Sequence, residues 1–154
     1  MYRAMYTAAS GMQAQQLNLD NVANNLANAS TSGFRRRRLQ FQDLIYQNLV
    51  APGAAATQQT TFPTGLQIGL GSRTAASEII QQQGDFNQTG NPIVGTPGGT
   101  EGLGSIQQGV LENSNVDVVG EFIQMIVAQR SYEANSRVVK AADGMFQTIN
   151  GLIA

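Results

Sequence analysis

Apolar residues recur at helical spacing at both ends of the chain, and this pattern restricts the fold more than any other feature. Between Met5 and Leu26, successive positions lie three or four residues apart, and all but Gln15 are apolar. This is the spacing of a helix that packs against another helix in coiled-coil fashion. The positions are Met5, Ala8, Met12, Gln15, Leu19, Val22 and Leu26.

The C-terminal end carries a matching pattern, with apolar positions three, four or seven residues apart. Asp117 is placed to cap a helix, and Glu121 would lie in its first turn, where the helix dipole favours an anion. We expect a helix over residues 118–151, roughly 50 Å long at 1.5 Å per residue. A helix of that length needs a partner, and the N-terminal helix is the obvious one. Its positions are Val127, Ala134, Val138, Ala141, Met145 and Leu152.

The middle of the chain contains all four prolines and many of the glycines, which favours turns and short strands. We predict a short helix over residues 41–49, an extended segment over 54–64 and a strand where Leu66, Ile68 and Leu70 alternate with Gln67 and Gly69. The expected class is α+β, with long terminal helices and a small β or extended middle. The expected division is 1–33, 34–114 and 115–154.

Two segments of the middle region resemble each other. Residues 80–89 and 106–114 share an order of Ile, paired Gln, Gly, then apolar and polar residues. We predict that they pair as neighbouring strands. The junction between them, residues 90–104, is rich in Gly, Pro and Thr and reads as a loop.

Composition argues against most enzyme and binding classes. The chain has no Cys and no His, which removes thiol and Ser-His-Asp catalysis and the usual zinc ligands. A net charge of −1 gives no overall field to attract nucleic acid. The N-terminus lacks an apolar signal core, and no run approaches the ~20 apolar residues of a membrane span. We predict no catalytic, cofactor or metal site, no nucleic-acid partner and no membrane insertion.

Residues 23–35 read Ala-Asn-Asn-Leu-Ala-Asn-Ala-Ser-Thr-Ser-Gly-Phe-Arg. This stretch resembles the N-terminal signature of the flagellar rod and hook protein family, and residues 114–119 with 125–136 resemble its C-terminal signature. The matching motif positions are Asn24, Asn25, Leu26, Ala27, Asn28, Thr31, Gly33 and Phe34.

The segments 41–47, 52–53 and 60–69 are similar to a stretch typical of the distal-rod members of that family. The resemblance implies a structural subunit that polymerises through its terminal helices into a rigid hollow drive shaft. It also implies export without signal cleavage, a place in the periplasm-spanning rod, and proximal-rod subunits, hook subunits and the ring bushing as partners. The family's large outer β domain, expected after residues 88–92, is missing.

Several alternatives stay open. The terminal seams could form a hairpin within one chain or pack between chains, which we favour. Arg35, Arg36, Arg37 and Arg38 could be solvated or could pair with acids of a neighbouring subunit, for which Asp43, Glu112 and Glu121 are candidates. The Asn residues of the motif are expected to fix register between helices. Alternative functions are a proximal-rod or hook subunit, and a soluble export adaptor that binds clients through its helices.

Overall fold

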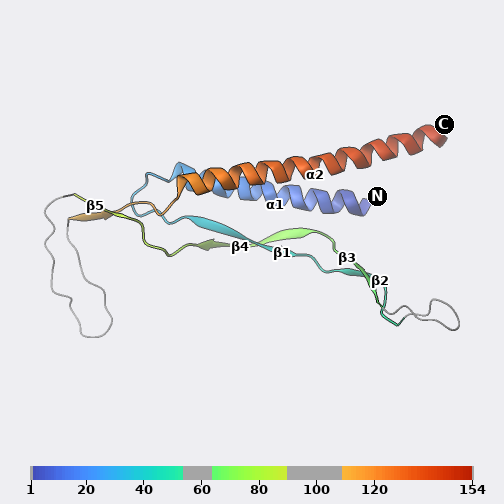
Figure 1. The fold of residues 1–154 in the computed structure, drawn as a ribbon, viewed down its shortest axis with the longest axis horizontal. Coiled ribbons are helices and arrows are strands. Elements are labelled where there is room, and N and C mark those ends of the chain that lie inside the picture. Colours follow the sequence, from blue (N-terminus) through green and yellow to red (C-terminus); the bar gives the residue numbers. More distant parts are fainter. Residues whose placement is uncertain (1, 54–63, 90–108, 154) are drawn as a thin grey trace. The chain divides into compact units, whose positions relative to one another are not determined.

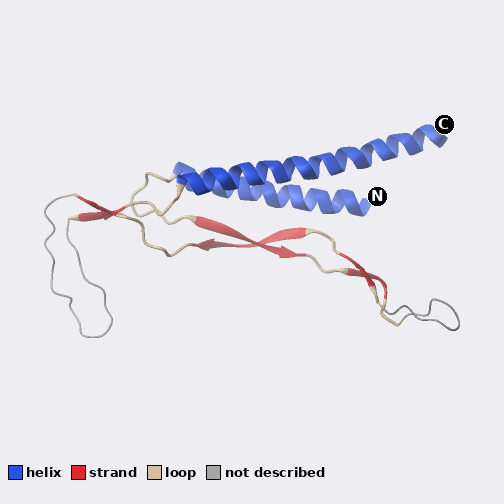
Figure 2. Ribbon diagram, viewed as in Figure 1, coloured by secondary structure: helices blue, strands red, loops and turns tan. Residues whose placement is uncertain are grey.

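The computed structural model describes residues 2–53, 64–89 and 109–153, which form a helix at each end and six short strands between them (Figures 1 and 2). The helices are α1 (Tyr2–Ala27) and α2 (Val118–Ile153). The strands are β1 (Arg37–Asp43), β2 (Gln47–Val50), β3 (Leu66–Ile68), β4 (Ser72–Ile79), β5 (Phe86–Gln88) and β6 (Val110–Glu112). The predicted α+β class is confirmed.

The end of α1 and the start of α2 are set by local hydrogen bonds. Past α1, the Asn28 side-chain amide donates to the Asn24 carbonyl at 2.9 Å, and Gly33 adopts a φ of 70°. At the start of α2, Asp117 Oδ1 accepts the Val119 N–H at 3.2 Å, so the predicted N-cap is confirmed. Among the described residues, no helix is both long and apolar enough to cross a bilayer.

The chain folds into two compact units, each built from segments far apart in sequence. Unit 1 consists of Met1–Asp20, Leu39–Ala76 and Ile126–Ala154. Unit 2 consists of Asn21–Arg38 and Ser77–Met125. Each unit therefore contains part of both helices, and neither can form until the two ends of the chain have met.

In unit 1 the two helices run antiparallel and meet through small residues (Figure 1). Gly11 faces Asn135, and a Cβ added to that glycine would lie 2.8 Å from the Asn135 amide nitrogen. Nearer the chain ends, the rings of Tyr2 and Phe146 lie 5.4 Å apart. The buried apolar side chains of this unit are all alanines, namely Ala8, Ala14, Ala128 and Ala142.

The face of α2 that meets α1 is displaced by one residue from the predicted seam. Asn135 and Phe146 contact α1, and Ala128 and Ala142 lie two turns on either side of Asn135. Each of these four residues is the next residue in the sequence after one of the predicted seam positions. The predicted residues Val127, Ala134, Val138, Ala141, Met145 and Leu152 are exposed in the single chain.

The displacement has a steric cause. Helices that approach over Gly11 and Ala14 leave room only for small side chains opposite, and the larger apolar residues of α2 turn outward. On α1 the agreement is closer, because Ala8 and Val22 are buried and Met5, Met12, Leu19 and Leu26 are half-buried. Whether the outward residues of α2 meet another chain stays a prediction.

The strands pair two by two, as β1 with β4, β2 with β3 and β5 with β6. The helix predicted over residues 41–49 is wrong, because this stretch holds the end of β1 and most of β2. Gln47 pairs with Ile68 and Asn48 with Gln67, so the backbone of β2 bonds to β3 instead of to itself. The predicted strand at Leu66 and Ile68 is confirmed as β3.

The two similar segments pair as predicted. In the β5–β6 ladder, Phe86 is opposite Glu112, Asn87 opposite Leu111 and Gln88 opposite Val110. The two similar segments therefore contain two strands that bond to each other. The expectations for residues 54–63 and for most of the junction 90–104 lie outside the described residues.

Gly71 gives a test of how closely the strands approach α1 in unit 1. It has a φ of 113°, and a Cβ there would collide with the Ser10 hydroxyl. Gly33 has a φ of 70° but open space around it. We expect Gly33→Ala to lower the free energy of unfolding by about 1–2 kcal/mol, the cost of a left-handed alanine. Gly71→Ala should cost at least about 1 kcal/mol more because of the collision.

Urea unfolding followed by circular dichroism measures both costs. The excess cost of Gly71→Ala should shrink when Ser10→Ala is added, since the shorter side chain removes the obstacle. Equal costs for the two glycine substitutions would contradict the proposed close packing.

Candidate functional site

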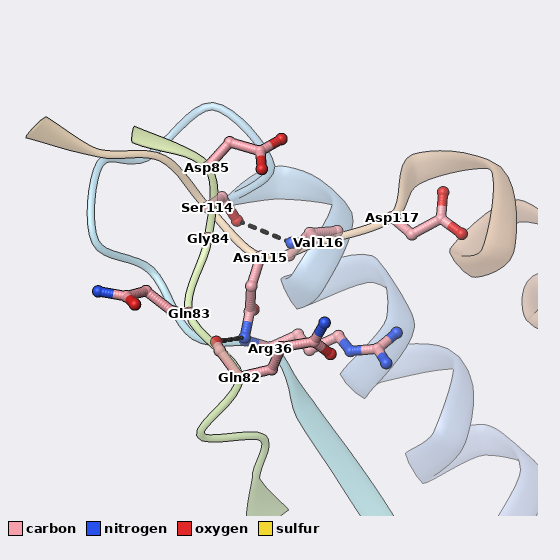
Figure 3. A pocket seen from close by; sticks show the side chains of 9 residues that line it. All are labelled: Arg36, Gln82, Gln83, Gly84, Asp85, Ser114, Asn115, Val116 and Asp117. Atoms are coloured by element: carbon pink, nitrogen blue, oxygen red, sulfur yellow. Dashed lines mark hydrogen bonds between the residues drawn. The ribbon is translucent and has the colours of Figure 1, made fainter. Parts of the chain in front are cut away.

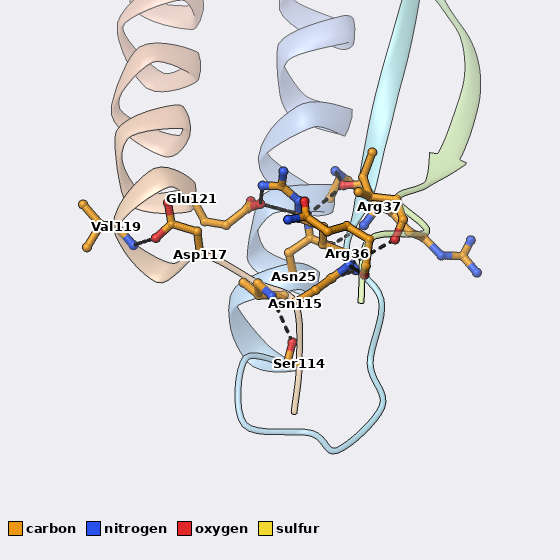
Figure 4. A network of polar contacts seen from close by, with 12 residues as sticks. Asn25, Arg36, Arg37, Ser114, Asn115, Asp117, Val119 and Glu121 are labelled. Atoms are coloured by element: carbon orange, nitrogen blue, oxygen red, sulfur yellow. Dashed lines mark hydrogen bonds and ion pairs between the residues drawn. The ribbon is translucent and has the colours of Figure 1, made fainter. Parts of the chain in front are cut away.

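The densest set of polar contacts in the described chain lies inside unit 2 (Figure 4). It joins the two segments that resemble the signatures of the rod and hook family, residues 23–35 and 114–119. We call this set the polar junction. It consists of Asn25, Asn115, Glu112 and Glu121 together with residues 33–38, to which they bond. These residues come from the end of α1, the start of β1, the end of β6 and the start of α2.

Asn25 is the central residue of the polar junction, with only 1% of its surface exposed. Its Oδ1 accepts the Arg37 backbone N–H at 3.0 Å, and its Nδ2 donates to the Arg37 carbonyl at 2.8 Å. The amide thus bonds both polar groups of one residue, as a neighbouring strand would. The same Nδ2 lies 3.3 Å from both carboxylate oxygens of Glu121. One side chain therefore links α1, β1 and α2.

Glu121 is a buried carboxylate, 2% exposed, in the first turn of α2. Besides Asn25, it faces the Arg36 guanidinium at 4.0 Å. A buried charge is costly unless it is paired and hydrogen-bonded, so Glu121 stays buried only while α1 and β1 are both in place. The positive end of the helix dipole adds to its stabilisation.

Asn115 performs a similar role on the opposite side of Arg36. Its Oδ1 accepts the Arg36 backbone N–H at 2.7 Å, while its Nδ2 donates to the carbonyls of Ile80 and Gln82 at 3.0 and 2.7 Å. The Ile80 N–H in turn donates to the Arg36 carbonyl at 3.0 Å. The segment before α2 is thereby bonded to the residue that precedes β1 and to the segment that follows β4.

Glu112 closes the junction near the end of α1. Its backbone carbonyl accepts the Gly33 N–H at 2.7 Å. Its carboxylate accepts the Gly84 N–H at 3.1 Å and pairs with Arg35 at 3.3 Å. The turn that ends α1 is therefore bonded to β6, more than seventy residues later in the chain.

The arginine run is used mostly inside the chain. Arg35 pairs with Glu112, Arg36 with Glu121 and Arg38 with Glu78, the last at 3.2 Å. Two of the three acids expected to pair across subunits, Glu112 and Glu121, therefore have partners in the same chain. No carboxylate of the described residues pairs with Arg37.

A hollow of about 390 Å³ lies beside the junction (Figure 3). Its walls include Gln82, Gln83, Asp85, Ser114 and Asp117, and the Asn115 amide reaches Gln82 along one side. The described residues contain no group of three or more His, Cys, Asp or Glu side chains placed to hold a metal ion. The walls of the hollow carry amide, hydroxyl and carboxylate groups, which are suited to polar contacts.

The structure brings only part of the predicted motif into the junction. Asn25, Gly33 and Phe34 take part directly and Asn28 bonds the end of α1, whereas Leu26 is half-buried and Asn24, Ala27 and Thr31 are exposed. Asn115 was not predicted from the sequence as a site residue. Its place in the C-terminal family-like segment, paired with the Asn-rich N-terminal one, was the available signal.

Both parts of the chain that form the polar junction match models of known protein families. The model of a family described as flagella basal body rod protein matches residues 5–35. A second, described as the C-terminal part of flagellar basal body rod FlgEFG proteins, matches residues 107–152. The segments that bond to each other here are thus those that define a class of structural proteins of the bacterial flagellum.

Individual relatives agree with these matches. The flagellar basal-body rod protein FlgG of Borreliella burgdorferi is 28% identical over 263 positions, covering 99% of both chains. FlgG of Agrobacterium fabrum is 45% identical over 92 residues, 59% of this chain and 35% of the relative. The flagellar hook protein FlgE of Treponema pallidum is 38% identical over 90 residues, 58% of this chain and 19% of the relative. The chain belongs to the flagellar basal-body rod protein family.

Membership makes the chain a structural rod subunit of the flagellar basal body that assembles with other axial proteins. The Borreliella alignment extends over 263 positions, while this chain has 154 residues, so at least 109 positions have no counterpart here. The absence of the outer β domain expected from the sequence stays a prediction.

Asn25→Ala tests whether the polar junction stabilises unit 2. The substitution leaves the Arg37 N–H and the Glu121 carboxylate without their amide partner, while the Arg37 carbonyl keeps its bond from Asn21, so we expect a loss of about 3 kcal/mol of unfolding free energy. Asn24→Ala is the matched control, because Asn24 is exposed, and it should change stability by less than about 0.5 kcal/mol. Urea titrations at low protein concentration compare the two, and equal losses would show that the junction adds nothing.

Proposed function

We propose that the chain is a distal-rod subunit that polymerises through its terminal helices into a rigid hollow drive shaft. The observation that carries this proposal is the outward seam of α2 in unit 1. There Val127, Val138 and Met145 are each about half exposed, and Leu152 is 82% exposed. A single chain leaves this regular apolar row uncovered, and burying one such side chain contributes about 1.5–3 kcal/mol.

The covering element is proposed to be a helix of another copy. The α2 row keeps coiled-coil spacing, which suits a helix better than a flat surface. On α1, the half-buried Met5, Met12, Leu19 and Leu26 reach the surface beside the fully buried Val22. A face that contacts a different face on the next copy repeats without closing, which yields a helical polymer.

The middle segment supports the choice of a distal-rod subunit. Among the described residues between 41 and 70, the large exposed apolar side chains are Phe41, Ile45, Tyr46, Leu49, Leu66 and Ile68. Leu49, Leu66 and Ile68 lie on the paired strands β2 and β3, and Ile45, which is 85% exposed, lies just before β2. We propose that they fill gaps between subunits and so resist bending of the shaft.

The remaining expectations belong to the same proposal. The rod is proposed to span the periplasm, and the chain to be exported without a cleaved signal. Its neighbours are proposed to be further copies, proximal-rod and hook subunits, and the ring bushing. The role is mechanical and not enzymatic, which the absence of His and Cys supports. The similarity to hook proteins keeps a hook or proximal-rod subunit as the second candidate.

Val127→Asp tests the outward seam. The added carboxylate should raise the concentration needed for filament growth by at least about tenfold, because it would be buried without a partner. Gln129→Asp, also at an exposed position of α2, should leave assembly nearly unchanged. Sedimentation and electron micrographs of concentrated protein give the readout, with circular dichroism to show that both variants fold.

The wild-type protein should form long straight filaments as its concentration rises. A monodisperse monomer at high concentration would overturn the polymer proposal. Normal filaments from Val127→Asp would show instead that the outward seam is not the contact.

A further inference from the structure

Arg37 differs from the other three arginines of its run. Arg35, Arg36 and Arg38 each face a carboxylate of the same chain. Within the described residues, the Arg37 guanidinium contacts no acid, and the side chain is exposed. Figure 4 shows it extending away from Glu121 and the rest of the polar junction.

The backbone of Arg37 is nevertheless held at both polar groups. Asn25 accepts its N–H at 3.0 Å, and both Asn21 and Asn25 donate to its carbonyl at 2.8 Å. Two side chains of α1 therefore fix where this arginine leaves the strand. Fixing the backbone in advance lowers the entropy lost when the side chain binds something.

The hollow in unit 2 offers groups that complement an arginine. The Asp85 carboxylate makes no hydrogen bond or ion pair within the described chain, and Asp117 uses Oδ1 for the Val119 N–H, which leaves Oδ2 available. The amides of Gln82 and Gln83 and the hydroxyl of Ser114 add acceptor oxygens. The guanidinium of Arg36, the cation in the wall, already faces the Glu121 carboxylate at 4.0 Å, and the Arg36 backbone N–H donates to Asn115.

We propose that the Arg37 guanidinium of one copy enters this hollow on a neighbouring copy and pairs with Asp85 and Asp117. The inference rests on the proposed function, since it needs copies of the chain side by side. A planar guanidinium with five N–H donors suits two carboxylates flanked by amide oxygens. The volume of about 390 Å³ accommodates one such group and its waters.

This contact would have a direction. Arg37 and the hollow are different surfaces of unit 2, so each copy gives an arginine to one neighbour and accepts one from another. Contacts of this type propagate instead of closing into a dimer. The apolar seam of α2 would supply most of the binding free energy, and the Arg37 pair would select the register at which copies meet.

A charge exchange tests the proposal in the full chain. Arg37→Asp should raise the concentration needed for assembly by about tenfold or more, since it places like charges opposite each other. Asp85→Arg alone should do the same, and the double variant should recover most of the loss. Arg73→Glu, a reversal at an exposed arginine of β4, is the control and should have little effect.

Cross-linking provides a second readout that does not depend on the size of the effect. The chain has no Cys, so Arg37→Cys and Asp85→Cys each introduce a unique thiol. When the two variants are mixed under assembly conditions with a short bismaleimide, linked pairs should form between unlike copies. Either variant alone should give few pairs.

The outcomes separate the two proposals. If wild-type protein forms filaments but Arg37→Asp assembles equally well and no mixed cross-links appear, the Arg37 contact is wrong and the polymer proposal stands. If wild-type protein forms no filaments at all, both proposals fall. Loss with Arg37→Asp that Asp85→Arg restores, together with mixed cross-links, supports the contact.

Discussion

The bonding of Asn25 to the backbone of Arg37 is the contact on which the described fold depends most. An amide is suited to this position because it donates and accepts from one planar group, as a peptide does. Asn25 therefore serves as a short strand neighbour for β1 while it remains part of a helix. Its remaining donor capacity is directed at Glu121, so the burial of that carboxylate is tied to the same side chain.

Two kinds of contact stabilise the described chain: the packing of α1 against α2 in unit 1 and the hydrogen bonds of the polar junction in unit 2. In unit 1 the helices approach closely over Gly and Ala, which gives tight contact but little buried apolar area. Among the described residues of unit 2, Val22 is the one buried apolar side chain, Asn25 and Glu121 are buried polar ones, and directional hydrogen bonds supply the specificity. Polar bonds and small residues favour one register without a large core.

The sequence predicted the helices well and their packing less well. Periodicity located α1 and α2, because an apolar stripe at helical spacing depends only on local order. It did not identify the α2 residues that meet α1 within the chain, because Val127 and Met145 are more hydrophobic than Ala128 and Asn135, whereas the close approach at Gly11 favours small side chains. The contacts of Asn115 and Glu121 depend on pairing between distant segments, and a single sequence reveals them only through a family resemblance. The pairing of residues 80–89 with 106–114 was predicted correctly, because the similarity that suggested it can be seen within this one sequence.

The β5–β6 ladder also determines how the chain can vary in length. Next to the end of β5 and the start of β6, the Thr89 N–H and hydroxyl both donate to the Gly109 carbonyl at 2.9 Å. Two strand ends closed in this way form a stem, and the entropic cost of a longer insert above a closed stem grows only slowly with its length. The segment inserted between β5 and β6 can therefore differ in length, from a short loop to a whole domain, while the helices and the polar junction stay unaltered.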